Sequence, residues 1–230
     1  MKVQRLRVTF TRLDDLQYVT HLDMMRLWER ALRRAGIPVA YSEGFSPHPQ
    51  IALAAPLAVG VTSECELMDV FLEETLTPRA FIERTAPQLP PALAIVDVRE
   101  AGMALPSLQA DVRAAEYLVD APAPDALDVD AAVRAFLAAE TVPWQHMRDD
   151  EVRSYDLRTL VFELESMGGD GGDARLRMLL RNDNSGSGRP EQVALALGLG
   201  QPARIHRVRL VLAETSPARA AYRAHGRYES

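Results

Sequence analysis

Four segments of the sequence carry side chains that can bind an anion or move a proton. The first, Thr20-His21-Leu22-Asp23, stands where a helix is expected to begin. The outward N–H groups of a helix's first turn, with His21 beside them, would suit a phosphate or a carboxylate. A purely structural interpretation also fits, because Thr20 and Asp23 have the types and spacing of a helix cap.

The second segment, residues 41–49 (YSEGFSPHP), is a loop that two prolines and a glycine make stiff. It presents Tyr41, Phe45 and His48, and a stiff loop loses little entropy on binding. We expect this loop to lie beside the first turn of the preceding helix, so that the two segments form one anion-accepting pocket. Alternatively, Phe45 fills the core and the prolines only shape the turn. Phosphate contacts are expected from four arginines of the helix: Arg26, Arg30, Arg33 and Arg34.

The other two segments lie in the second half of the chain. In the extended run SYDLR, Asp156 and Arg158 point to the same side, where they could pair with each other or bind a polar ligand. The run RIHRVR near the C-terminus places His206 and Arg207 on opposite faces of a predicted strand. Such a strand either contacts an anion or is an exposed edge whose charges oppose aggregation.

Other catalytic and metal chemistry lacks a motif. Cys65 is the only cysteine, and with His21, Asp23 and His48 it lacks the spacing of a metal site. The sequence has no glycine-rich phosphate loop, no GxSxG and no CxxxCxxC cluster. No apolar run approaches the roughly 20 residues that cross a bilayer, and the N-terminus lacks the apolar stretch of a secretory signal. We therefore expect a cytoplasmic protein without membrane contact.

Composition indicates a globular protein with an uneven charge. Of 230 residues, 47% are hydrophobic and 25% are charged, which excludes wholesale disorder. The net charge of −6 argues against indiscriminate coating of nucleic acid. Residues 1–50 nevertheless carry eight basic and five acidic side chains, whereas residues 51–150 carry six and seventeen. A local basic face is therefore permitted in the first part of the chain.

Hydrophobic periodicity predicts the same order of elements twice. In the first half we expect helices over 20–35 and 77–88 and strands over 3–10, 51–55, 65–73 and 93–98. In the second half we expect helices over 128–139 and 190–198 and strands over 115–120, 144–148, 160–166, 175–180 and 204–212.

The order β-α-β-β-α-β is typical of the ferredoxin-like fold. We therefore predict the α+β class with two tandem ferredoxin-like domains, residues 1–102 and 114–213, joined by a linker at 103–113. In each domain the helices would cover one face of an antiparallel sheet and leave the other face open. Residues 214–230 have no apolar face and are predicted to be a disordered tail.

The same segments resemble a known family. The runs VTHLDMMRLWERALRRAGIPVAYSEGFSPHPQIALAAPLAVGVTSECELMDV, SYDLR and RIHRV are similar to the radical SAM-linked (radical SAM-associated) proteins, a bacterial family of unknown biochemical function. The resemblance implies a protein fused to, or encoded beside, a radical SAM enzyme in a setting concerned with RNA. The iron–sulfur cluster and S-adenosylmethionine would belong to that partner, and no cofactor is expected in this chain.

These observations predict a non-catalytic accessory protein that binds tRNA or rRNA for a radical SAM partner. Two alternatives stay open. One is a protein-docking module whose open sheets contact the partner without touching RNA. The other is a metal-independent RNA-processing enzyme that uses histidine acid–base catalysis.

Overall fold

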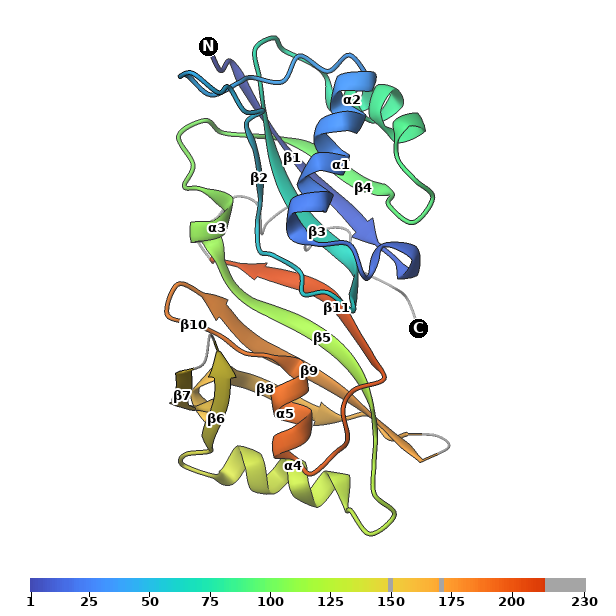
Figure 1. Cartoon of the computed structure of the whole chain (residues 1–230), viewed down its shortest axis with the longest axis vertical. Helices are drawn as coiled ribbons and strands as arrows, with labels where there is room; N and C mark the ends of the chain where they lie inside the picture. Colours follow the sequence, from blue (N-terminus) through green and yellow to red (C-terminus); the bar gives the residue numbers. More distant parts are fainter. Residues whose placement is uncertain (149–150, 170–171, 214–230) are drawn as a thin grey trace. The chain divides into compact units, whose positions relative to one another are not determined.

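The computed structural model describes residues 1–148, 151–169 and 172–213 and shows a mixed α/β protein with mainly antiparallel strand pairing (Figure 1). The chain divides into two compact units. Of the described residues, unit 1 comprises Met1–Val112 and residues 209–213, and unit 2 comprises those within Arg113–Val208. The mixed class with antiparallel sheets is confirmed, and the predicted tail, residues 214–230, lies outside the described residues.

The sheet of unit 1 is positioned by alternation along its strands. It has the order β2-β3-β1-β4, and each neighbouring pair is antiparallel. The side chains of Leu6, Val8 and Phe10 on β1 point to one face and are buried in the core. The strands are β1 (Gln4–Arg12), β2 (Ile51–Leu53), β3 (Val61–Leu72) and β4 (Ile95–Ala101).

Two helices, α1 (His21–Arg34) and α2 (Pro78–Thr85), cover that apolar face (Figure 1). Trp28 of α1 is completely buried and meets the Phe10 ring edge-on, with 5.0 Å between ring centroids. Two short 3-10 helices, η1 (Asp14–Leu16) and η2 (Ala86–Gln88), flank the pair.

The ends of α1 follow from local sequence signals. The Thr20 hydroxyl accepts a hydrogen bond from the Asp23 backbone N–H and so caps the start of the helix. At the other end Gly36 has φ +63°, a conformation that glycine adopts without strain. The Ile37 N–H donates to the Leu32 carbonyl, as in a Schellman motif, and both side chains enter the core.

The opposite face of the unit 1 sheet is buried over β1 and β3, contrary to the expectation of an open face. Arg5, Arg7 and Asp69 lie there with exposed fractions of only 2%, 1% and 0%. Residues 103–113, expected to be a linker, contain α3 (Leu108–Asp111), and the Arg5 guanidinium donates to the carbonyls of Leu105 (2.9 Å) and Pro106 (2.9 Å). This segment therefore packs on unit 1 and occupies part of the face.

In unit 2, β9 pairs with β5, β8 and β10, and β11 lies beside β5. Strand β8 pairs with β9 in antiparallel fashion, from Val161 opposite Leu180 to Ser166 opposite Leu176. A separate ribbon, β6 (Pro143–Arg148) with β7 (Glu151–Asp156), was predicted only in its first strand. The other elements are β5 (Val112–Pro122), α4 (Val129–Ala138), η3 (Leu157–Leu160), β8 (Val161–Ser166), β9 (Asp173–Asp183), β10 (Gly186–Ser187), α5 (Pro190–Ala196) and β11 (Arg204–Leu212).

Among the described residues, none of the helices combines the length and the apolar character needed to span a bilayer.

Candidate nucleic-acid interface

The loop after α1 holds its aromatic residues out from the surface. The Ser42 N–H donates to the His48 carbonyl (2.9 Å), and the His48 N–H donates to the Ser42 hydroxyl (3.0 Å). These two bonds close the loop at its base, and Phe45 between them is fully exposed. The alternative in which Phe45 fills the core is therefore wrong. We call residues 41–49 the aromatic loop.

A small cavity of about 110 Å³ lies at the base of the aromatic loop. The loop contributes Tyr41 and Pro49, which pair with each other across an isolated β-bridge. Helix α1 contributes Glu29, Leu32 and Arg33. The remaining lining is apolar and comes from Ile37, Val39 and Ile51. The cavity thus combines one carboxylate, one guanidinium and one aromatic ring on an apolar floor.

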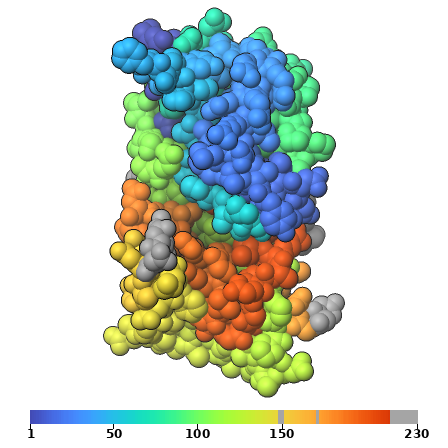
Figure 2. All heavy atoms as spheres, viewed as in Figure 1, coloured from blue at the N-terminus to red at the C-terminus, as the bar shows by residue number. Residues whose placement is uncertain are grey.

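A row of arginines runs along the exposed side of α1 toward this cavity. Arg26, Arg30 and Arg33 are exposed and follow a spacing of four and then three residues, which places them on one helix face. Arg26 pairs with Asp23 (3.2 Å), whereas Arg30 and Arg33 form no ion pair or hydrogen bond within the described residues. The neighbouring Arg34 donates to the Gln88 carbonyl (3.0 Å). Figure 2 shows the surface of α1 and the aromatic loop on the same visible face of unit 1.

The first turn of α1 is occupied by its own cap. The Thr20 hydroxyl donates to Asp23 Oδ2 (2.7 Å) and accepts from the Asp23 N–H (3.2 Å). The Thr20 hydroxyl, followed by the nearby Arg26, holds the pKa of the Asp23 carboxyl below its usual value. The capping interpretation of this segment is therefore the one that the contacts support, while His21 remains exposed beside it.

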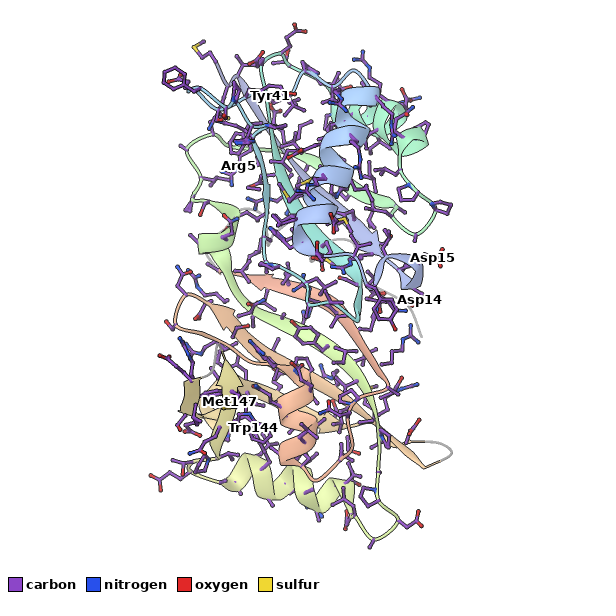
Figure 3. All side chains as sticks on the ribbon, in the orientation of Figure 1. Arg5, Asp14, Asp15, Tyr41, Trp144 and Met147 are labelled. Carbon is purple, nitrogen blue, oxygen red and sulfur yellow. The ribbon has the colours of Figure 1, made fainter. Side chains whose placement is uncertain are left out.

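The structure does not bring His21 and Asp23 together with the aromatic loop. A helix of fourteen residues is about 20 Å long, and His21 is its first residue. Tyr41 lies instead beside Glu29 and Arg33, in the second half of α1. Figure 3 shows Tyr41 toward one end of unit 1 and Asp14 and Asp15, which precede α1, toward the other. The expected single pocket is wrong because the chain must travel the full length of the helix before the loop begins.

Glu29 was not singled out from the sequence. It stands four residues before Arg33, where an acidic residue is normally expected to form an intrahelical ion pair. Its place in the cavity depends on the return of the chain through Ile37 and Tyr41 alongside the helix, which no local pattern encodes.

The side chains of Asp156 and Arg158 bind backbone groups and form no ion pair with each other within the described residues. The Asp156 carboxylate accepts from the N–H groups of Val142 (2.8 Å) and Arg158 (3.0 Å). The Arg158 guanidinium donates to the carbonyls of Leu137 (3.3 Å) and Val161 (2.8 Å). Both side chains therefore hold the start of η3 and the base of the β6–β7 ribbon, and the expected ion pair between them does not form within the described residues.

The two residues of the last strand differ in exposure. Arg207 is completely buried, with an exposed fraction of 0%, and His206 is half-buried. The expectation that Arg207 belongs to an exposed edge is therefore wrong. Alternation within β11 correctly placed the two side chains on opposite faces, but it carries no information on what covers each face.

No cluster of three or more His, Cys, Asp or Glu side chains suited to a metal ion occurs in the ranges that the structure describes.

The fold and this surface define a two-unit α/β protein that exposes arginines and aromatic side chains on one side of its first unit. The chain belongs to the family described as "Uncharacterized protein conserved in bacteria (DUF2344)", whose model matches residues 5–190. The expected membership in a bacterial family of unknown function is thus confirmed. No curated protein matches the sequence.

Two solved structures are similar over most of the chain. A chain of the crystal structure of a Cbf5-Nop10-Gar1 complex matches with a TM-score of 0.51 and 11% identity, covering 89% of this chain and 48% of that one. A chain of the archaeal box H/ACA sRNP Nop10-Cbf5 complex matches with a TM-score of 0.46 and 14% identity, covering 91% and 49%. The protein thus spans about half the length of these chains, and the first likeness indicates a shared fold.

Proposed function

We propose that this protein binds single-stranded RNA through unit 1, as a non-catalytic accessory protein. The observation that carries the proposal is the fully exposed Phe45 on a closed loop, next to a helix whose Arg30 and Arg33 form no ion pair or hydrogen bond within the described residues. Exposed aromatic rings stack on unpaired bases, and exposed arginines contact phosphates. These are the two elements that sequence-tolerant binding of single strands requires.

The test measures binding of a fluorescein-labelled single-stranded RNA by anisotropy at several salt concentrations. Contacts from three or four arginines of α1 predict a slope of log K against log salt between about −2 and −3. Absence of binding, or binding that does not change with salt, would overturn the proposal.

Replacing Phe45 by alanine tests the stacking contribution separately. A stacked base contributes about 1–3 kcal/mol, so the F45A variant is expected to bind about 5 to 140 times more weakly. The matched control is Tyr18→Ala, because Tyr18 is also an exposed aromatic residue but lies before α1, outside the aromatic loop. Equal losses in the two variants would show that the loop has no special role.

A radical SAM enzyme is the proposed protein partner, on the basis of the sequence resemblance, with the iron–sulfur cluster and S-adenosylmethionine carried by that enzyme. Co-purification of the two proteins from cells, repeated after nuclease treatment, separates direct contact from contact through RNA. Failure to co-purify under either condition would remove this partner and leave the RNA proposal intact.

The two alternative functions have less support from the geometry. A docking module would need an open sheet face. In unit 1, however, Arg5, Arg7 and Asp69 are buried on the face opposite the helices. An RNA-processing enzyme needs an acid and a base within reach of one phosphodiester. His21 and His48 do not meet this requirement, because they belong to segments at opposite ends of α1.

We also propose that both units have the ferredoxin-like fold. Unit 1 has the element order β1-α1-β2-β3-α2-β4, with the sheet order β2-β3-β1-β4 and both helices on one face. Unit 2 has the equivalent elements β5, α4, β8, β9, α5 and β11, with the β6–β7 ribbon inserted between α4 and β8. The insertion accounts for the additional strand, over 144–148, that the second half of the chain was predicted to have relative to the first.

A further inference from the structure

We infer that the cavity between α1 and the aromatic loop receives one guanine base of the bound RNA, which deepens the proposed function and rests on it. The volume of the cavity limits the size of the group that can enter it. A volume of about 110 Å³ is well below the roughly 300 Å³ at which sites for whole small molecules begin. The cavity can therefore take one flat ring system of a larger ligand, while the rest of that ligand stays outside.

The hydrogen-bonding groups that line the cavity determine which ring system can bind in it. Glu29 offers only acceptors when ionised, and Arg33 offers only donors in a planar fork. The two side chains stand four residues apart on one helix face, so their Cβ atoms are about 5–6 Å apart. No ion pair joins them within the described residues, so both remain able to bind a ligand.

Guanine satisfies both groups at once. Its N1–H and exocyclic amino group are adjacent donors that match the two oxygens of the Glu29 carboxylate. Its O6 and N7 are adjacent acceptors, and an arginine fork binds this pair in a bidentate manner. Adenine, cytosine and uracil each lack either the two adjacent donors or the two adjacent acceptors. Tyr41, which is about half exposed at the cavity, supplies an aromatic face for the ring.

The surroundings indicate that the base belongs to an RNA strand. The row of Arg30 and Arg26 leads from the cavity along α1, and Phe45 is fully exposed on the loop whose base lines the cavity. A strand whose base enters the cavity can therefore place phosphates on the arginines and a further base on Phe45. A free nucleotide would use only the cavity and the nearest arginine.

The experiment compares eight-nucleotide oligouridylates that carry one central guanosine, inosine, adenosine or cytidine, with anisotropy as the readout. A bidentate contact contributes about 1–3 kcal/mol, so guanosine is expected to strengthen binding about 5- to 140-fold over the all-uridine strand. Inosine, which lacks the 2-amino group, should recover only part of this gain. Equal binding of all strands would overturn the guanine inference and leave the RNA proposal standing, whereas no binding of any strand would overturn both.

The variant Glu29→Gln adds an independent test. It should sharply reduce the ratio of the affinities for the guanosine-containing and all-uridine strands, because an amide accepts through one oxygen only. An unchanged ratio would overturn the guanine inference. Its control is Glu83→Gln on α2, where the carboxylate is exposed and pairs with Arg79 (2.7 Å). GMP serves as a competitor: displacement of the strand by GMP at concentrations as low as those of unlabelled guanosine-containing RNA would overturn the assignment to an RNA base.

Discussion

The arginines of unit 1 form two groups that differ in burial and in partners. Arg5 and Arg7 on β1 are buried, and their guanidinium groups both bind Asp69, at 2.9 Å from Arg5 Nε to Oδ2 and 2.8 Å from Arg7 Nε to Oδ1. Arg30 and Arg33 on α1 are exposed and form no ion pair or hydrogen bond within the described residues. Arginine side chains therefore stabilise the fold on β1, whereas on α1 they are available to bind a ligand.

Arg12 shows how a buried arginine acts on the segment before α1. Its guanidinium donates to the carbonyls of Leu16 (3.0 Å), Gln17 (3.0 Å) and Val19 (2.6 Å). These carbonyls lie between β1 and the Thr20 cap, so Arg12 fixes the point at which the helix begins. The exposed arginines of α1 are thus oriented by a helix that a buried arginine helps to position.

The largest expected effect comes from removing the shared counter-ion of the buried group. Asp69→Ala leaves Arg5 and Arg7 buried without a carboxylate, and breaking a buried ion pair in this way costs about 3–5 kcal/mol. Urea unfolding of unit 1 measures the loss through the fluorescence of buried Trp28, in a background where Trp144 is replaced by phenylalanine.

The control for this prediction is Glu83→Ala, which breaks the exposed Arg79–Glu83 pair in the same unit. Surface pairs of this kind contribute about 0.3–0.5 kcal/mol, so the two variants should differ severalfold. If Asp69→Ala lowered the free energy of unfolding no more than Glu83→Ala does, the buried ion pairs would contribute no more to stability than the exposed one.

The exposed group gives the second prediction, in which binding changes and stability does not. The double variant Arg30→Gln, Arg33→Gln should reduce the steepness of the salt dependence of binding to the all-uridine strand by about 1.4. On that strand neither arginine is engaged with a guanine, and each phosphate contact on a single strand contributes about 0.7. Its free energy of unfolding should stay within about 0.5 kcal/mol of the parent protein.

Arg79→Gln is the matched control for charge, because Arg79 is an exposed arginine on α2 and outside the proposed interface. An equal change in salt dependence for Arg79→Gln would mean that RNA responds to overall charge rather than to the row on α1.

Local signals predicted elements well, while burial depended on contacts far apart in the sequence. The bounds of α1 follow from Thr20 and Gly36, and the last strand was predicted with the limits it has in the structure, Arg204–Leu212. Exposure of the aromatic loop was also anticipated. These features depend on residues within a few positions of each other, which a single sequence displays.

The failures share one physical cause. Arg5 and Arg7 alternate with the core residues of β1 and so lie on the face away from the helices. Only the pairing of β1 with β3 brings Asp69, more than sixty positions later, between them. In the same way, Asp156 and Arg158 have backbone partners on segments that folding brings near. The predicted pocket failed because the length of α1 separates His21 from the aromatic loop.

The smallest expected effect concerns Asp23, which limits the availability of Arg26. Because the Thr20 hydroxyl and then Arg26 stabilise the carboxylate, the pKa of Asp23 in the folded state lies below its ordinary value of 3.8. A lowered pKa means that the capping contribution is complete above about pH 4 and is lost as the pH falls through the folded-state pKa. Carbon-detected NMR titration of the Asp23 carboxyl measures this directly.

Thr20→Val removes the hydroxyl and should raise the pKa of Asp23 toward 3.8, whereas Thr20→Ser keeps a hydroxyl and should leave it lowered. Asp23→Asn should in turn release Arg26 from its ion pair and steepen the salt dependence of RNA binding by at most about 0.7. A pKa of Asp23 that is the same in both Thr20 variants would show that the cap does not hold the carboxylate.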